Sequence, residues 1–466
     1  MISKNLANTL YWQAEKFRGR IGIKERLEWL MKTQEMSAEE IKKIQLTKLN
    51  HLLHHAYLTV PYYQRVFKER NLCPDDINNQ ADLQKLPLLT REILLKHQDE
   101  LVSSKADFST IKNNYSSGST GRRALFKQDE NFRLWMRAHQ IRTYQWCSQW
   151  ELGERFVLLW GSEIYWNLQS IKDKLINFLS NRREFNTFKL SSRLIKNFTN
   201  SLLNFNPILI SSYANALHLI SLEVKRRGLR IPALRAIQTT SEPMPPAIRN
   251  RVQEVFNCEV FDKYGSRETN IVSHESPAHD GLLIQSENVV AEFLNQNLTA
   301  CLPHEKGKIV LTTLNNFSMP LVRYETSDIA APISGYSKES FQFSRMTEVS
   351  GREQDLIYTP NNDYIDSYFF SYLFMRFESI HWFQVTQEQY DHLRIVILAP
   401  NGINLETKNE IVDRITAHTG YKFKVDFEIL SEMPESSTGK FRLCVSKVKE
   451  SRNVAQAIVE DVHVTV

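Results

Sequence analysis

Short apolar runs alternate with helical patterns along the first three quarters of the chain. The runs lie at residues 156–160, 208–212, 236–240 and 260–261, and their length and aliphatic or aromatic content are typical of buried strands. Strands that alternate with helical stretches, such as 132–146, predict an α/β fold with parallel or mixed sheets. A more strand-rich region at 282–349 completes a large N-terminal domain, which we expect to span residues 1–350.

The hydrophobic pattern changes after Gly351. A helical pattern at 365–376 is followed by strand patterns at 382–386 and 393–398, a helix at 405–419 and a strand at 424–429. This order predicts a small α+β unit. We therefore place a domain boundary at Gly351 and expect a small C-terminal domain over residues 351–466.

The first 95 residues have the pattern of a helical leader segment on the large domain. Ser37-Ala-Glu-Glu40 is a capping box, which predicts that a helix begins there. Apolar residues then recur at helical spacing, namely Ile41, Ile44, Leu49, Leu52, Leu53 and Ala56. For this amphipathic helix, packing against the core is favoured over a role at a membrane surface.

The composition is that of an ordinary globular protein. Of 466 residues, 42% are hydrophobic and 24% charged, which argues against long disordered, collagen-like or coiled-coil structure. Lys and Arg number 58 against 53 Asp and Glu, and this surplus, spread without long charge runs, is too small to indicate a nucleic-acid partner. No apolar run is long enough to span a bilayer and no signal peptide opens the chain, so we expect a cytoplasmic protein without a transmembrane segment.

Cysteine and glycine usage narrow the chemistry. The five cysteines are odd in number, far apart and without a CxxC pair, so neither a disulfide framework nor a cysteine-rich zinc site is indicated. Glycine accounts for only 15 residues, about 3% against an average of ~7%. We therefore expect backbone geometry to require the glycines that remain. Five of them lie in segments that have the composition of ligand loops: Gly118, Gly121, Gly265, Gly351 and Gly439.

The first of these segments is Tyr115-Ser-Ser-Gly-Ser-Thr-Gly121. Two glycines among hydroxyl side chains let backbone N–H groups and hydroxyls point into one concavity, as in loops that hold phosphate oxygens. It is not a Walker P-loop, because GxxxxGK[ST] is absent. A flexible Gly/Ser linker is the alternative. The shortness of the segment and the helical pattern that follows at 132–146 favour the phosphate loop.

Three further segments carry residue types that suit a nucleotide. Residues 261–268 combine an aromatic ring, a glycine and a carboxylate, which could supply a stacking face, close backbone approach and a Mg²⁺ ligand. A strand pattern at 319–328 ends in Asp328, and Arg352 follows Gly351; a carboxylate can accept ribose hydroxyls and an arginine can hold phosphate. Residues 433–442 place Lys440 beside a glycine, as a point charge on a loop. Taken singly, each pattern is equally typical of an ordinary turn or a solvated surface.

The order of these segments resembles the adenylate-forming superfamily, which includes acyl-CoA synthetases and the adenylation domains of peptide synthetases. In that superfamily a Ser/Thr/Gly phosphate loop is followed by YGxTE-like, YRTGD-like and GRxDD-like segments and a late GK lysine. The matching segments here are SSGSTG (116–121), YGSRE (264–268), RYETSD (323–328), GREQD (351–355) and STGKFR (437–442). Five matches in order are a far more specific signal than any one of them.

The N-terminal part resembles the phenylacetate-CoA ligase-like branch of the superfamily. Its members share a PYY segment and an LPxLTK segment, matched here by residues 61–63 and 86–91. Gln354, Trp160-Gly161 and the strand at 383–385 are most similar to members associated with capsular polysaccharide biosynthesis. The resemblance thus covers nearly the whole chain.

The resemblance implies a nucleotide site, with ATP and Mg²⁺ as cofactors. In the phosphate loop, Ser117, Ser119 and Thr120 would hold phosphates and Gly118 and Gly121 would shape the backbone. The other implied binding residues are Ser241, Glu242 and Pro243 along the adenine, Tyr264 and Gly265 against it, Asp328 at the ribose and Arg352 at ribose and phosphate. Glu268 would coordinate Mg²⁺, and Lys440 would bridge the acyl carboxylate and the α-phosphate. Because Lys440 lies on the small domain, that domain is implied to be mobile and to close on the large one.

The implied reaction is activation of a small carboxylic acid as acyl-adenylate, with release of pyrophosphate, followed by transfer of the acyl group. The acceptor is left open between an amine or hydroxyl of a sugar, a carrier thiol and coenzyme A, and a role in surface polysaccharide biosynthesis is implied. Gln354 at the hinge and the lack of glycine over 358–363 weaken the case for coenzyme A. Two alternatives stay open: an aryl- or acyl-CoA ligase, and a non-catalytic relative that binds nucleotide.

Overall fold

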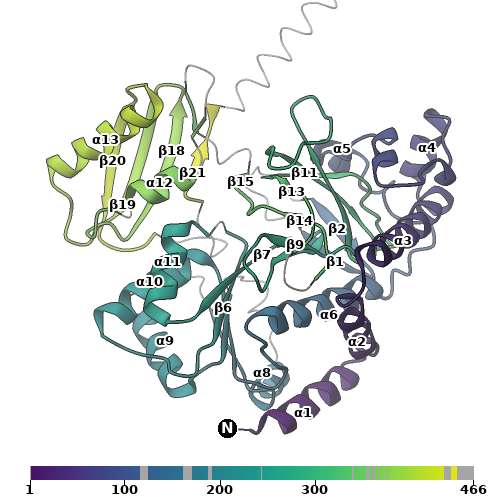
Figure 1. The fold of residues 1–466 in the computed structure, drawn as a ribbon, viewed down its shortest axis with the longest axis horizontal. Helices are drawn as coiled ribbons and strands as arrows, with labels where there is room; N and C mark the ends of the chain where they lie inside the picture. The colour runs from purple at the N-terminus through teal and green to yellow at the C-terminus, as the bar shows by residue number, and fades with distance from the viewer. Residues whose placement is uncertain are drawn as a thin grey trace, which may run out of the picture.

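A computed structural model gives the fold of the chain (Figure 1). It describes residues 2–115, 124–160, 171–186, 192–242, 244–337, 341–352, 357–359, 364–365, 367–374, 376–434 and 442–448. The helices are α1 (Lys4–Phe17), α2 (Ile23–Thr33), α3 (Ala38–Thr59), α4 (Pro61–Glu69), α5 (Arg91–Lys96), α6 (Glu130–Trp146), α8 (Ile171–Leu179), α9 (Ser192–Phe205), α10 (Ala214–Arg226), α11 (Pro246–Phe256), α12 (Ser367–Phe374) and α13 (Leu405–Thr419), with short 3₁₀ helices at Pro74–Asp76 and Ala81–Lys85. No described helix is both long enough and apolar enough to cross a membrane.

The strands form three larger sheets and two pairs within the described residues. Those of the large sheet and of the hairpin are β1 (Lys112–Tyr115), β2 (Leu125–Gln128), β3 (Phe156–Trp160), β4 (Arg182–Asn186), β5 (Leu209–Ser212), β6 (Ala236–Thr240), β7 (Glu259–Ser266), β8 (Asn270–Glu275), β9 (Leu282–Ile284), β13 (Pro332–Ile333) and β14 (Arg345–Met346). The others are β10 (Val289–Leu294), β11 (Gly307–Thr313), β12 (Tyr324–Ala330), β15 (Gly351–Arg352), β16 (Ile357–Tyr358), β17 (Tyr364–Ile365), β18 (Trp382–Gln389), β19 (His392–Leu398), β20 (Lys424–Leu430) and β21 (Cys444–Ser446).

The predicted α/β architecture is confirmed by the large sheet, whose order is β13-β14-β9-β8-β7-β6-β5-β3-β4. The strands from β4 to β7 pair in parallel, and those from β7 to β13 pair antiparallel. Apolar residues of the parallel strands alternate between two cores. One core lies against α9, α10 and α11 and the other against α6, so helices cover both faces, as parallel strands require.

A second, antiparallel sheet has the order β10-β11-β12-β15. Its strands lie beside the leader helices, and the sheet and the leader share one hydrophobic core. That core contains Leu52, Leu53 and Ala56 of α3 together with Val290 and Tyr324 of the sheet. The capping box at the start of α3 forms as predicted, because Ser37 accepts from the Glu40 N–H and Glu40 from the Ser37 N–H. The apolar face of α3 is thus a core face, as the spacing predicted.

The C-terminal unit is a four-stranded sheet of order β20-β19-β18-β21 with α12 and α13 packed on it (Figure 1). Its elements match the predicted order, and α13 has the predicted bounds. The first helix is shorter than predicted: it begins at Ser367 because Ile365 pairs with Ile357 between β17 and β16. The domain boundary at Gly351 stays a prediction.

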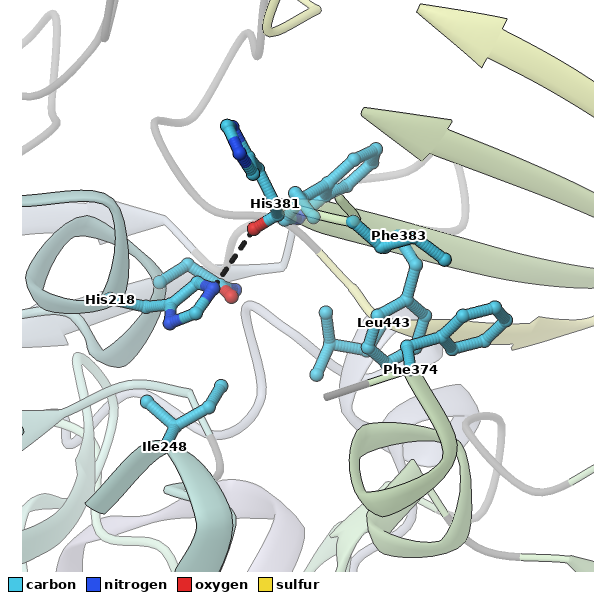
Figure 2. Close-up of a pocket in the computed structure, with 9 residues that line it drawn as sticks. His218, Ile248, Phe374, His381, Phe383 and Leu443 are labelled. Atoms are coloured by element: carbon cyan, nitrogen blue, oxygen red, sulfur yellow. Dashed lines mark hydrogen bonds between the residues drawn. The ribbon is translucent and has the colours of Figure 1, made fainter. Parts of the chain in front are cut away.

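The C-terminal unit meets α10 at a small cavity of about 20 Å³ (Figure 2). Asn215, His218 and Ile248 line it from the large domain, and Phe374, Phe383 and Leu443 are among the residues that line it from the C-terminal unit. The His218 Nε2–H donates to the backbone carbonyl oxygen of His381, 2.9 Å away. Burial and the nearby charges of Arg251 and His381 lower the pKa of His218 to about 4, so its imidazole is neutral at pH 7.

A buried ion pair ties the leader to the large sheet. Arg142 on α6 and Glu287, between β9 and β10, are both fully buried, and two parallel bonds of 2.8 and 3.1 Å join them. Thr33 at the end of α2 donates to the same carboxylate at 2.5 Å, and Arg142 also donates to the Leu30 carbonyl oxygen. Burial alone would raise the pKa of Glu287, but the Arg142 guanidinium lowers it to about 2, so the pair is charged.

The substitution Glu287→Leu is expected to lower the free energy of unfolding by about 3–5 kcal/mol, since it leaves the Arg142 charge buried without its partner. Denaturant unfolding at pH 7 measures this. Glu39→Leu removes an exposed pair with Lys42 and should change stability by no more than about 1 kcal/mol. The double variant Arg142→Met/Glu287→Leu should recover most of the loss; a single variant as stable as the wild type would contradict the account.

Stability is expected to fall as the pH drops from 6.5 toward 4 through His218. Its folded pKa of about 4 lies below the value of an unfolded histidine, so the unfolded chain binds more protons in this interval; the loss is on the order of 2–3 kcal/mol. Melting temperatures at pH 7 and pH 5 should therefore differ less in His218→Gln, which keeps a donor and removes the titration. The control His51→Gln changes an exposed histidine and should keep the wild-type difference.

Candidate active site

The two sheets of the large domain are joined at Tyr264 and Asp328. Tyr264 lies near the end of β7 and Asp328 on β12, and the Tyr264 hydroxyl donates to Asp328 Oδ2 at 2.7 Å. Burial and the Asp328 charge raise the pKa of Tyr264 well above its usual value, so the hydroxyl stays protonated and donates. This contact brings two of the predicted site residues together across 64 positions of sequence.

An irregular backbone sets the direction of Asp328. Ser327 has a left-handed φ of 66°, and the pairing of β11 with β12 shifts register just before Asp328. Thr326 donates from Oγ1 to the Ile309 carbonyl oxygen and accepts from the Asp328 N–H. Such an irregularity re-aims one side chain of a strand. Asp328 is paired with Arg352 of β15 in the sheet register, and only the backbone of Arg352 is described.

Position 265 requires glycine because the backbone of β8 lies very close to it, and not because of the φ angle of Gly265. A Cβ at this position would lie 2.4 Å from the Asn270 carbonyl oxygen and 3.0 Å from the Ile271 Cα, so any side chain would push β8 away. The pairing of β7 with β8 shifts register between Tyr264 and Gly265. The expectation that backbone geometry requires this glycine is therefore met.

The predicted phosphate loop is flanked by a hairpin that reaches the turn of Glu268. Strands β1 and β2 pair antiparallel, with Tyr115 opposite Leu125, on either side of residues 116–123. Gln128, at the end of β2, donates from Nε2 to the Arg267 carbonyl oxygen at 2.5 Å. The half-buried Glu268 follows Arg267 in the turn between β7 and β8. The base of the hairpin is therefore adjacent to the residue implied to coordinate Mg²⁺.

Ser241 and Glu242 lie at the carboxyl end of β6. Ser241 has a left-handed φ of 71°, and the buried Glu242 carboxylate accepts from the Asn215 N–H at 3.0 Å, at the start of α10. A carboxylate there stabilises the positive end of a helix. Tyr213, which precedes the same helix, lies with its ring centroid 5.0 Å from that of Trp160. Carboxyl ends of neighbouring parallel strands meet at one edge of the sheet, which is where α/β proteins bind ligands.

Several predicted site residues lie outside the described part of the chain. They are the phosphate-loop residues Ser117, Gly118, Ser119, Thr120 and Gly121, with Pro243 and Lys440. The segment of Lys440 is described again from Arg442, whose carbonyl oxygen accepts from Gln384 of β18. It then continues as β21, so the lysine belongs to the chain segment that enters the C-terminal sheet.

Two supporting residues have roles that sequence reasoning did not assign. The hydroxyl of buried Tyr63, from the PYY segment, donates to the Pro320 carbonyl oxygen at 3.1 Å and accepts from the Val322 N–H at 2.9 Å. Tyr63 therefore holds the backbone that leads into β12. The PYY match signalled that this position matters, but a sequence motif alone does not show which distant backbone the tyrosine contacts.

Arg323 is the second supporting residue, and it is part of the RYETSD segment. Its buried guanidinium forms two bonds with Glu292 of β10, at 2.9 and 3.1 Å, and donates to the Leu86 carbonyl oxygen of the LPLLT segment. The Arg323 carbonyl oxygen accepts from the Leu89 N–H, and the Leu89 carbonyl oxygen from the Glu325 N–H. The arginine before Asp328 thus joins the leader to the strand that carries the aspartate.

Strand β8 holds a fully buried histidine, His274. His274 Nε2 lies 3.5 Å from Cys147 Sγ and 3.1 Å from Gln238 Nε2, a cysteine contact that sequence spacing did not reveal. Burial lowers the pKa of His274 to about 3. Among the described residues, no three His, Cys, Asp or Glu side chains are grouped so that they could hold a metal ion.

The chain is similar in sequence to several known proteins. Residues 357–447 match the family model of the CapK C-terminal domain. The chain is 21% identical to the phenylacetate-coenzyme A ligase of Aromatoleum evansii over 70% of this chain and 73% of the ligase. It is 18% identical to protein CapK of Staphylococcus aureus over 83% of this chain and 85% of CapK.

A solved structure supports the fold over the whole length. The 2-hydroxyisobutyryl-CoA ligase in its postadenylation state, in complex with R3-HIB-AMP, superposes with a TM-score of 0.73 at 16% identity and covers 92% of this chain and 94% of that protein. The fold and the resemblance predicted from the ordered motifs are thereby confirmed. In sequence the chain is thus similar to phenylacetate-coenzyme A ligases and to protein CapK, and its fold is that of a solved CoA ligase.

Proposed function

We propose that this protein activates a small carboxylic acid as acyl-adenylate at the junction of its two sheets and passes the acyl group to a nucleophilic acceptor. The observation that carries the proposal is the Tyr264–Asp328 hydrogen bond. It joins the carboxyl end of β7 to β12, beside the Glu268 turn and the hairpin that flanks the Ser/Thr/Gly loop. The superfamily uses these segments for nucleotide, and we propose that they form one site in this chain.

The described residues suit a bound ATP. Asp328 uses Oδ2 for the tyrosine, and its carboxylate has further lone pairs for ribose hydroxyls; the partly exposed Tyr264 ring offers a flat face to a base. The proposed nucleotide residues are Ser117, Gly118, Ser119, Thr120, Gly121, Ser241, Glu242, Pro243, Tyr264, Gly265, Asp328 and Arg352. Glu268 is proposed to hold Mg²⁺, which would neutralise phosphate charge when bound.

The proposed chemistry needs charge neutralisation first. An oxygen of the acid attacks the α-phosphorus of ATP, the bond to the β-phosphate oxygen breaks, and pyrophosphate leaves with the electron pair. We propose that Lys440 holds the carboxylate and α-phosphate together while charge builds up between them. The acceptor then attacks the acyl carbon, loses its proton, and AMP leaves.

Closure of a small domain on a large one follows from this proposal. We place the boundary at Gly351, with residues 1–350 as the large domain and 351–466 as the small one. Lys440 would then be brought to the Tyr264–Asp328 junction by domain movement. In the described residues, the hydrogen bond from His218 to the His381 carbonyl oxygen is one contact between the two units.

The acceptor and the acid are proposed by class. The sequence resemblance to members associated with capsular polysaccharide biosynthesis supports a role in surface polysaccharide biosynthesis, where an amine or hydroxyl of a sugar, or a carrier thiol, would accept the acyl group. Similarity to phenylacetate-coenzyme A ligases supports a second candidate, in which coenzyme A is the acceptor. We propose that Trp160 and Tyr213, whose rings are in contact, line the pocket for the acid; an aromatic lining favours a flat or apolar acid.

Trapping with hydroxylamine tests the first half-reaction. With ATP, Mg²⁺ and a panel of aryl, aliphatic and amino acids, we expect hydroxamate from one class of acid. Lys440→Ala should lower the rate about 100-fold or more, because its charge acts on the transition state. ATP that binds tightly without any turnover, and equally in Lys440→Ala, would instead support a non-catalytic nucleotide-binding protein.

The junction itself is tested by the KM for ATP. Asp328→Ala should raise it about 10- to 100-fold, because a charged acceptor for ribose hydroxyls is lost, and Tyr264→Phe by about 3- to 10-fold, because one hydrogen bond is lost. Steady-state pyrophosphate release measures both. Glu325→Gln alters a neighbouring carboxylate that pairs with Lys308 and should keep the wild-type KM; an unchanged KM in Asp328→Ala would contradict the assignment.

A further inference from the structure

Exposed apolar side chains gather on α1 and α8, away from the candidate active site. Phe17 is 74% exposed and Ile21 66%, at the end of α1 and in the turn after it. On α8, Ile171 is 88%, Leu175 56% and Phe178 63% exposed. Their i, i+4, i+7 spacing places them on one face of the helix. A large apolar surface in contact with water is typical of an interaction site rather than of a free surface.

The two helices form one continuous surface element, because they run antiparallel side by side (Figure 1). At one end Asn181, just after α8, donates to the Ile2 carbonyl oxygen. At the other end Arg18, directly after α1, forms an ion pair with Asp173 of α8. The end of α1 that carries Phe17 therefore lies at the end of α8 that carries Ile171. We call this element, residues 2–24 and 171–186, the basal helix pair.

The segments of the basal helix pair also carry a surplus of basic residues. Residues 2–24 contain five Lys or Arg against one Glu, and residues 171–186 contain four against two acids, a formal charge of +6 in all. The whole chain carries +5, so the remaining residues carry −1. Within the described residues, the exposed Lys16 and Lys174 have no acidic partner. Apolar and cationic groups are thus concentrated in the same place.

We propose that the basal helix pair is a docking surface for an anionic lipid bilayer. Apolar side chains edged by lysine and arginine bind the headgroup region of such a membrane, without spanning it. A second copy of this chain is a poorer occupant, because a two-fold contact would bring two surfaces of charge +6 together. Helix α3 is not part of this surface, since its apolar face is buried in the core, as the sequence favoured.

Flotation of the full-length protein with vesicles tests the proposal. Vesicles of phosphatidylcholine with 30% phosphatidylglycerol should carry the protein upward at low salt, and pure phosphatidylcholine vesicles should not. Leu175→Glu/Phe178→Glu should weaken binding at least tenfold. The matched control Leu302→Glu/Leu405→Glu places the same charges at equally exposed leucines elsewhere and should bind like the wild type.

The electrostatic part has its own pair of variants. Lys16→Gln/Lys174→Gln should weaken binding by about tenfold, and Lys422→Gln/Lys424→Gln, at exposed lysines of the C-terminal unit, should leave it unchanged. Thermal melts confirm that each variant is folded. The proposal is overturned if the wild-type protein does not float with anionic vesicles, if both matched pairs lose binding alike, or if the apolar surface mediates self-association by light scattering instead.

Discussion

The position of Asp328 depends on one constraint: the backbone that leads into β12 is held by side-chain contacts with the leader and with β10. Tyr63 hydrogen-bonds to this backbone at residues 320 and 322. Arg323 has a left-handed φ of 53°, and its side chain donates to the Leu86 carbonyl oxygen and to the Glu292 carboxylate. A buried arginine is stable only when its donors are satisfied, and here they are supplied by a strand and by the leader together. The leader is therefore part of the site, although none of its residues reaches the Tyr264–Asp328 junction.

A similar division holds on the other sheet. Tyr264 and Glu242 lie at the ends of strands β7 and β6. Buried polar contacts fix the helices around them: Arg142 of α6 pairs with Glu287, and Glu242 accepts from the N–H of Asn215 at the start of α10. Buried polar groups of this kind tolerate few alternative arrangements, because each needs its partner. The chain has few glycines to relax such constraints, and the left-handed positions at Ser241, Arg323 and Ser327 are held by non-glycine residues.

Local sequence predicted the elements well where their own pattern determines them. The strand at 156–160, the strand at 236–240 and the helix at 405–419 have the predicted bounds, because their apolar periodicity is strong. The candidate site was predicted through ordered motifs; the structure brings two of its residues, Tyr264 and Asp328, into contact, and the nucleotide roles of these residues stay predictions. The roles of Tyr63, Arg323 and His218 could not be predicted in this way, since each depends on a contact across more than 160 residues. The contact between Cys147 and His274, which lie 127 residues apart, could not be predicted from the local sequence either.

The distance along the chain between the leader and β12 has a consequence for biosynthesis. Arg323 lies 237 residues after Leu86, and Val322 lies 259 after Tyr63, so β12 can reach its final geometry only when nearly the whole large domain has left the ribosome. The leader helices emerge first and must keep an apolar surface exposed until that strand arrives. The proposed nucleotide site is thus among the last parts of the large domain to form. Until β12 has been synthesised, the exposed apolar surface of the leader would need protection from aggregation.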